Sequence, residues 1–137
     1  MTYIKTIPIE FNHCDPAGIV FYPRYFEMIN SVVENFFADV VGRSFAQMHF
    51  GGAQNGVPTV RIEANFASPS RLGETVEFAL EVVRVGTSSL ALTITASHMA
   101  KHRLRADLTV VWIDHARAAP WPADMRANLL DFQEHPA

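Results

Sequence analysis

Residues 22–42 read YPRYFEMINSVVENFFADVVG, and this stretch decides the fold. Its apolar residues recur at spacings of three and four, which predicts one long helix over residues 22–41 with a broad apolar face. Pro23 suits the first turn, where a missing N–H costs no hydrogen bond, and Gly42 suits the position just past the end. A helix of about 20 residues is roughly 30 Å long, so we expect it to be buried on several sides.

On both sides of this helix, apolar and polar residues alternate with the period of a β-strand. Each of these runs has one apolar face, which predicts an antiparallel sheet with one packed side and one wetter side. Residues 86–87 and 99–102 indicate hairpin turns. Short helical segments are expected at residues 45–49 and 123–132. The predicted strands are residues 4–11, 59–66, 76–82, 90–97 and 103–112.

These elements predict the architecture but leave the strand order open. Five strands with one apolar face need a cover, and the helix over residues 22–41 is the largest element available. The sequence therefore predicts an α+β fold in which a curved antiparallel sheet wraps around one long helix. Without an internal repeat or a linker, residues 1–137 are expected to form a single domain.

The composition of the chain indicates which binding partners and which cellular compartment to expect. A formal net charge of -3 gives no general electrostatic attraction to nucleic acid or to an anionic membrane. The apolar runs are far shorter than the roughly 20 residues of a membrane span, and the N-terminal residues lack the pattern of a signal peptide. Cys14 is the only cysteine, so no disulfide forms within the chain. We expect a cytoplasmic protein with no nucleic acid or membrane partner.

The loop before the helix carries the chemistry. Residues 12–18 read NHCDPAG, a run of turn-forming residues, and Pro16 holds Asp15 in an extended or turn geometry. The segment His13–Tyr25, HCDPAGIVFYPRY, resembles the signature of the 4-hydroxybenzoyl-CoA thioesterase class of hot-dog-fold proteins. That signature is an Asp, an Ala-Gly pair, an apolar stretch and an aromatic residue that opens the long helix. Residues 65–66 and 108–113 are similar to the family in order and spacing, so the resemblance covers nearly the whole chain.

The resemblance implies a hot-dog fold, an acyl-CoA substrate and a homodimer or homotetramer with active sites at the subunit interface. Asp15 is the candidate catalytic carboxylate, which attacks the thioester directly or activates a water; the sequence leaves both routes open. By resemblance, the backbone N–H of Tyr22 at the helix start binds the carbonyl oxygen, where orphan amides and the helix dipole favour negative charge. Gly18 has no side chain to block the approach of a substrate.

Further residues are candidates for substrate binding. Tyr25 is expected to line the acyl pocket, and His13 and Pro16 to lie beside the site. Asn30 takes the place at which many family members carry an acid, which argues against a 4-hydroxybenzoyl substrate but allows contact with a polar acyl substituent. For the coenzyme A moiety the candidates are Arg84, Ser88 and Ser89, with further basic candidates at Arg61, Arg71, Lys101, Arg103 and Arg105.

The sequence gives weaker support for a cysteine nucleophile or a metal site. Adjacent residues of an extended chain point to opposite sides, so His13 and Cys14 make a poor catalytic pair. His98 and His102 have helical ligand spacing in a segment that is predicted to be a hairpin, so we expect no metal, and no cofactor beyond the coenzyme A of the substrate. The alternatives that stay open are a hot-dog hydratase or dehydratase, and a non-catalytic acyl-CoA-binding protein. Whether the acyl carrier is coenzyme A or a carrier protein also stays open.

Overall fold

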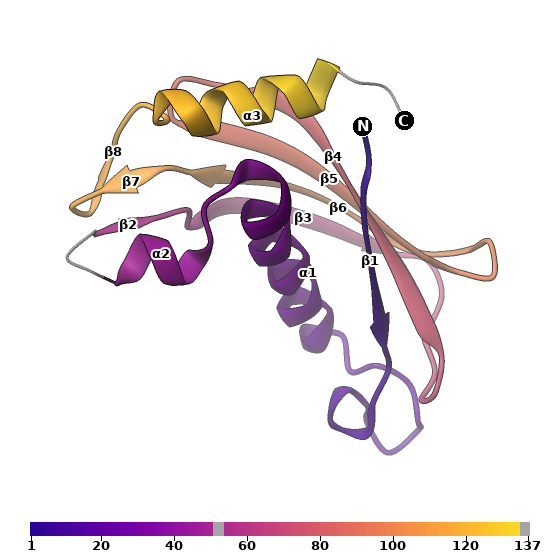
Figure 1. Ribbon diagram of the computed structural model, residues 1–137. Coiled ribbons are helices and arrows are strands. Elements are labelled where there is room, and N and C mark those ends of the chain that lie inside the picture. The colour runs from indigo at the N-terminus through magenta and orange to yellow at the C-terminus, as the bar shows by residue number, and fades with distance from the viewer. Residues whose placement is uncertain (51–53, 135–137) are drawn as a thin grey trace.

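The computed structural model describes residues 1–50 and 54–134, and its centre is a curved antiparallel sheet around the helix α1 (Pro23–Phe36) (Figure 1). The strand order, which the sequence left open, is β1-β4-β5-β6-β3. The α+β architecture predicted from the sequence is confirmed. The strands of this sheet are β1 (Tyr3–Pro8), β4 (Thr75–Val85), β5 (Ser89–His98), β6 (Lys101–Val111) and β3 (Thr59–Phe66).

The long helix follows its prediction at both ends. Pro23 is the first helical residue, and the helix continues beyond Phe36 as a π-helical turn, Phe37–Val41. Gly42 ends it in the left-handed conformation with φ 91°, and its N–H donates to the Phe37 carbonyl at 2.9 Å. The expectation of burial on several sides is wrong for the single chain, because Phe26 and Asn30 lie on an exposed face.

The apolar faces of β4, β5 and β6 pack against α1 as predicted, with side chains such as Leu80, Ile94 and Leu108 in the core. The prediction of a packed apolar face is wrong for β3. Val60, Ile62 and Phe66 are 61%, 38% and 47% exposed, because β3 is the edge strand and the rest of the chain does not cover it fully. An apolar edge of this kind indicates a contact surface.

The first strand is shorter than predicted. β1 ends at Pro8, and Phe11–His13 form a 3-10 turn instead of continuing the strand. The turn is stabilised locally, since the N–H of Glu10 donates to Nδ1 of His13 at 2.9 Å. Phe11 therefore points into solvent rather than into the core.

The C-terminal helix α3 (Ala123–Glu134) lies across the far end of the sheet, beyond the end of α1 (Figure 1). Its buried residues include Leu129 and Phe132, and the Phe132 ring centroid lies 5.1 Å from that of Phe36. The predicted segment 123–132 is thus confirmed as a helix. The remaining elements are α2 (Phe45–His49), also as predicted, and a small sheet of β2 (Asn55–Gly56), β7 (Ile113–Asp114) and β8 (Arg117–Ala118).

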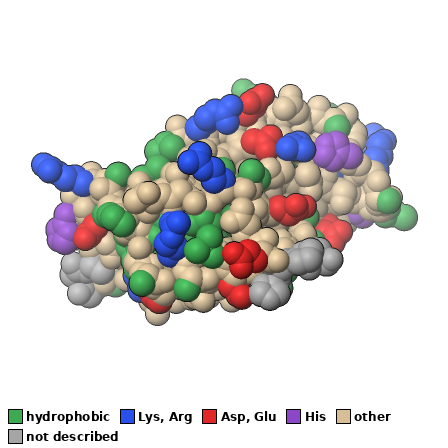
Figure 2. All heavy atoms as spheres, turned by 90° about the horizontal axis from the view of Figure 1, so that it is seen from above, with side chains coloured by type: hydrophobic (Ala, Val, Ile, Leu, Met, Phe, Trp, Pro, Cys, Tyr) green, Lys and Arg blue, Asp and Glu red, His purple; other side chains and the backbone are tan. Residues whose placement is uncertain are grey.

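Within the described parts of the chain, no helix combines the length and the apolar character needed to cross a membrane. The face over α3 carries basic and acidic side chains interspersed with one another rather than gathered by sign (Figure 2).

Candidate active site

The candidate catalytic loop is a narrow backbone hairpin over residues 13–21. The Phe21 N–H donates to the His13 carbonyl at 2.9 Å, and the Asp15 N–H donates to the Ile19 carbonyl at 3.0 Å. Gly18 closes the tip, donating its N–H to the Asp15 carbonyl at 2.9 Å, with φ 76°. No neighbouring atom would contact a Cβ at this position, so the left-handed backbone explains the glycine within the chain.

The Asp15 carboxylate lies at a cleft of about 490 Å³, which Phe11, Pro16, Gly18 and Leu72 also line. One of its oxygens, Oδ1, accepts a hydrogen bond from the Ala17 N–H at 2.9 Å. This bond fixes the carboxylate in the loop and leaves Oδ2 without a hydrogen-bond donor from the described residues.

The start of α1 supplies a free donor close to this loop. Pro23 has no N–H, and the N–H groups of Arg24 and Tyr25 donate to the carbonyls of Phe21 and Tyr22 at 2.9 and 3.1 Å. The Tyr22 N–H has no acceptor among residues 1–50 and 54–134. Tyr22 directly follows Phe21, whose N–H bond to His13 closes the hairpin that carries Asp15.

Tyr22 and Asp15 nevertheless line different hollows in the single chain. Tyr22 borders a hollow of about 290 Å³ with Tyr25, Phe66 and Pro69. The Tyr25 ring lies 5.6 Å from that of Phe66, and its hydroxyl is buried without a partner in the described parts of the chain. Tyr25 thus presents ring surface to the hollow, as expected for a residue that lines an apolar pocket.

His13 and Pro16 are separated by the loop. Pro16 lines the Asp15 cleft. His13, whose Nδ1 accepts from the Glu10 N–H, lines a different hollow of about 270 Å³ with Ile7, Glu27 and other residues of β1 and α1. Within one chain, therefore, only Pro16 of this pair shares a cleft with the candidate carboxylate.

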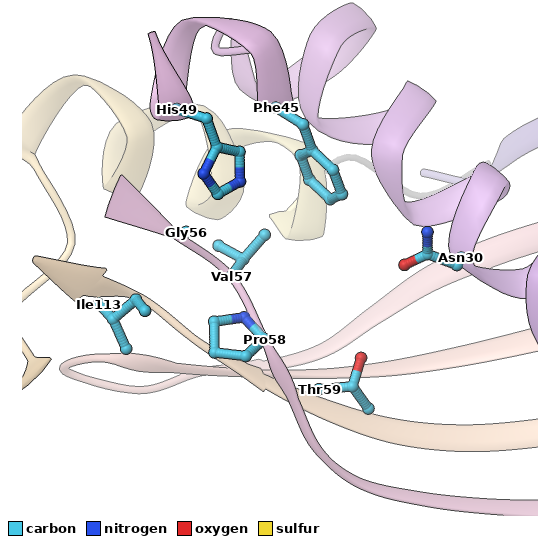
Figure 3. Close-up of a pocket in the computed structure, with 8 residues that line it drawn as sticks. All are labelled: Asn30, Phe45, His49, Gly56, Val57, Pro58, Thr59 and Ile113. Carbon is cyan, nitrogen blue, oxygen red and sulfur yellow. The ribbon is translucent and has the colours of Figure 1, made fainter. Parts of the chain in front are cut away.

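Asn30 lies further along α1 and borders a hollow of about 280 Å³ (Figure 3). His49 and Phe45 of α2 project into it from one side and Val57 and Pro58 from the other, with Thr59 at the start of β3. Its walls are apolar, and Asn30, His49 and Thr59 provide its polar side chains. His49 and Thr59 were not predicted from the sequence, because only the fold of the segment after α1 brings them opposite Asn30.

The expected coenzyme A residues lie at the other end of the sheet. β4 begins at Thr75, next to the candidate catalytic hairpin, and by strand rise its far end is roughly 33 Å away. Arg84 is exposed near that far end. The Ser88 and Ser89 carbonyls accept hydrogen bonds from the Trp112 N–H at 2.7 Å and the Trp121 Nε1–H at 3.1 Å. The structure does not bring these residues to Asp15 within one chain.

One of the basic residues expected to bind coenzyme A, Arg103, is buried. Arg103 is 5% exposed and forms an ion pair with Glu74, Nη1 lying 2.8 Å from Oε1. The guanidinium of Arg103, more than any other group, lowers the pKa of Glu74 to about 2. The Arg103 guanidinium is therefore already paired with Glu74 and is not available to bind the phosphates of coenzyme A.

No group of three or more His, Cys, Asp or Glu side chains is placed to hold a metal ion among residues 1–50 and 54–134. What the site offers chemically is a carboxylate at a cleft, a free amide at a helix start and apolar hollows along that helix.

Comparison with known proteins gives the class. Residues 9–129 match the model of the thioesterase-like superfamily, so the chain belongs to that family. No curated protein sequence matches the chain. Family and fold together make this protein a hot-dog enzyme of the thioester hydrolase class.

Solved structures share the fold at low sequence identity. A 1,4-dihydroxy-2-naphthoyl-CoA thioesterase from Synechocystis is 19% identical, with a TM-score of 0.87 over 99% of this chain and 100% of that one. A gentisyl-coenzyme A thioesterase is 20% identical, with a TM-score of 0.84 over 93% and 99% of the two chains. A thioesterase from Thermus thermophilus, complexed with coenzyme A and Zn, is 19% identical, with a TM-score of 0.83 over 98% and 96%.

Proposed function

We propose that this protein is an acyl-CoA thioesterase that hydrolyses an aromatic or short- to medium-chain acyl-CoA to the free acid and coenzyme A. The observations that carry the proposal are Asp15, which lines a cleft, and the Tyr22 N–H at the start of α1, which has no acceptor among the described residues. A thioesterase needs both a nucleophile or base and a donor for the oxyanion. The aromatic acyl-CoA thioesterases among the similar structures support the substrate class.

The reaction follows from these two groups. In the nucleophilic route, Oδ2 of Asp15 attacks the carbonyl carbon, and the Tyr22 N–H donates to the oxyanion of the tetrahedral intermediate. Collapse breaks the C–S bond, expels the coenzyme A thiolate and leaves a mixed anhydride, which water hydrolyses. In the general-base route, Asp15 takes a proton from the attacking water and returns it to the thiolate.

We also propose that a second copy of this chain completes the site. Val60, Ile62 and Phe66 leave an apolar surface at the β3 edge, and no strand of the described residues pairs with the outer side of β3. Pairing of two β3 edges would cover that surface. It would also allow Arg84, Ser88 and Ser89 of one subunit to serve the Asp15 loop of another in a homodimer or homotetramer.

The hollow at Asn30 is the proposed acyl pocket of such an assembly. Its apolar walls suit a ring or a short chain, and the Asn30 carboxamide suits a neutral polar substituent rather than a cation or an anion. We place the enzyme in the cytoplasm, because its single cysteine needs no oxidising compartment.

A thiol-release assay with purified protein and a panel of aromatic, short-chain and medium-chain acyl-CoA thioesters tests the proposal. We expect release of coenzyme A from at least one aromatic or short- to medium-chain member with a kcat of about 1–10 per second. Tight binding of acyl-CoA with no thiol release across the panel would instead identify an acyl-CoA-binding protein. Loss of an enoyl double bond without thiol release would identify a hydratase.

A further inference from the structure

The catalytic hairpin is held from outside by the segment that connects β3 to β4, residues 67–74, here called the connector. The Val20 N–H donates to the Ser70 carbonyl at 2.9 Å, and the Leu72 N–H donates to the Gly18 carbonyl at 3.0 Å. Ile19 and Arg71 face each other in an antiparallel bridge between these bonds. The position of the Asp15 loop therefore depends on the position of the connector.

The connector also fixes the chain just before the hairpin. The Ile9 N–H donates to the Glu74 carbonyl at 2.8 Å, and the Gly73 N–H donates to the Ile9 carbonyl at 3.0 Å. Both sides of the loop that carries Asp15 are thus tied by backbone hydrogen bonds to one irregular segment. An irregular segment has no ladder of its own, so other contacts must hold it in place.

Arg103 of β6 provides those contacts. Its Nη1 donates to the Pro69 carbonyl and to Oε1 of Glu74, both at 2.8 Å, and its Nη2 donates to Oε2 of Glu74 at 3.2 Å. The same Oε1 accepts from the Arg71 N–H at 2.6 Å. The backbone carbonyl of Arg103 accepts from the Ala67 N–H at 2.8 Å. Arg103, a residue of an inner strand of the sheet, therefore forms hydrogen bonds with the connector at its start, its middle and its end.

The Arg103 side chain is buried and that of Glu74 is partly exposed, and burying a charge costs desolvation energy that the attraction of a pair often fails to recover, so stability alone is a weak reason for this pair. Its bidentate geometry does, however, fix both partners in one relative position. We propose that Arg103 and Glu74 are positioning residues of the thioesterase: they lock the connector, and the connector holds Asp15 in register with the Tyr22 N–H. This inference rests on the proposed function for its catalytic consequence, while the locking of the hairpin stands on the hydrogen bonds alone.

Amide hydrogen exchange tests the locking without any substrate. In Arg103→Met we expect exchange of the Val20 and Leu72 amides to accelerate at least about tenfold relative to the core amide of Ile94. The matched control is Arg105→Met, two residues along β6, whose partner Asp107 lies in an exposed pair. Unchanged hairpin exchange in Arg103→Met, or an equal rise at Ile94, would overturn the proposal.

Kinetics of a double variant separate positioning from stability. Arg103→Met/Glu74→Met leaves no unpaired buried charge, so we expect its melting temperature to recover toward that of the wild type relative to Arg103→Met. Its kcat on the best acyl-CoA of the panel should stay about 10–100-fold lower, with KM within about twofold, since misplacement affects the reacting groups. Recovery of kcat together with stability would show a purely structural pair. Absence of thiol release by the wild type would refute the proposed function and leave the exchange result standing.

Discussion

At the scale of single residues, the loop around Asp15 shows how local chemistry arranges a site. The sequence predicts that Asp15 and Gly18 share one loop, and in the structure both line the same cleft, while Tyr22 borders a different hollow. The reason for Gly18 could not be predicted: its φ of 76° and the open space around it show that the hairpin tip needs a left-handed residue. The sequence alone indicates only that a glycine leaves room for a substrate.

Gly18 gives a prediction at this scale. Gly18→Ala should destabilise the fold by about 1 kcal/mol, because an alanine in the left-handed region is strained, while Gly18→Asn should cost less. Urea denaturation of the three proteins measures the difference. An alanine variant as stable as the asparagine variant would show that backbone conformation is not the reason for the glycine.

At the scale of elements, periodicity predicts the helix and most of each strand, because burial of one face leaves a regular pattern in the residues. Periodicity does not show whether another part of the protein packs against the apolar face of a strand. β3 alternates in sequence as β5 does, but β3 is an edge strand whose register shifts between Thr59 and Arg61, and its apolar residues Val60, Ile62 and Phe66 stay exposed. For Arg103 the prediction from alternation is wrong in the opposite direction. The alternating pattern places Arg103 on the same exposed face as Arg105, but the connector covers Arg103 and buries it.

The Glu74–Arg103 pair gives a pH prediction for the fold. Glu74 has a folded pKa of about 2, below its ordinary value of 4.5, chiefly because Arg103 donates to it. A depressed pKa contributes stability above pH 4.5, and that contribution is lost as the pH falls toward 2. The other groups that face Glu74 are the Arg71 N–H, which donates to Oε1, and His98, whose Nε2 lies 3.7 Å from Oε2; both also lower the pKa of Glu74.

Urea unfolding at intervals between about pH 5 and pH 2 measures this contribution. The free energy of unfolding of the wild type should fall over this range more steeply than that of Glu74→Gln. Glu27→Gln, which removes a carboxylate from an exposed pair with Arg24, is the control and should keep the wild-type slope. Equal slopes for the wild type and Glu74→Gln would contradict the assignment.

At the scale of the whole molecule, the candidate site is spread over more of the protein than the loop. The hollow at Asn30 lies along α1, and the turn that carries Ser88 and Ser89 lies at the far end of β4. Their distance from Asp15 depends on strand order and on assembly, which spacing along the chain does not encode. Assembly through the exposed edge of β3 is therefore the feature that would join the parts.

The apolar edge gives the prediction at this scale. Val60→Lys should convert the proposed dimer or tetramer to monomers, since a buried lysine at a paired edge is costly, and thiol release should fall with it. Met99→Lys, on the exposed β5–β6 turn, is the matched control and should leave assembly unchanged. Light scattering coupled to gel filtration measures the mass directly. A wild-type protein that is already monomeric would refute assembly through this edge.

The central claim is that the Asp15 carboxylate performs the hydrolysis, and single-turnover thiol release by Asp15→Asn measures it most directly. The amide keeps the shape of the side chain but is neither a nucleophile nor a base. We expect the rate to fall by about 10²–10⁴-fold with acyl-CoA affinity and melting temperature near those of the wild type, while Asp124→Asn, in an exposed pair with Arg43, keeps its activity. An Asp15→Asn enzyme that releases thiol at the wild-type rate would contradict the account.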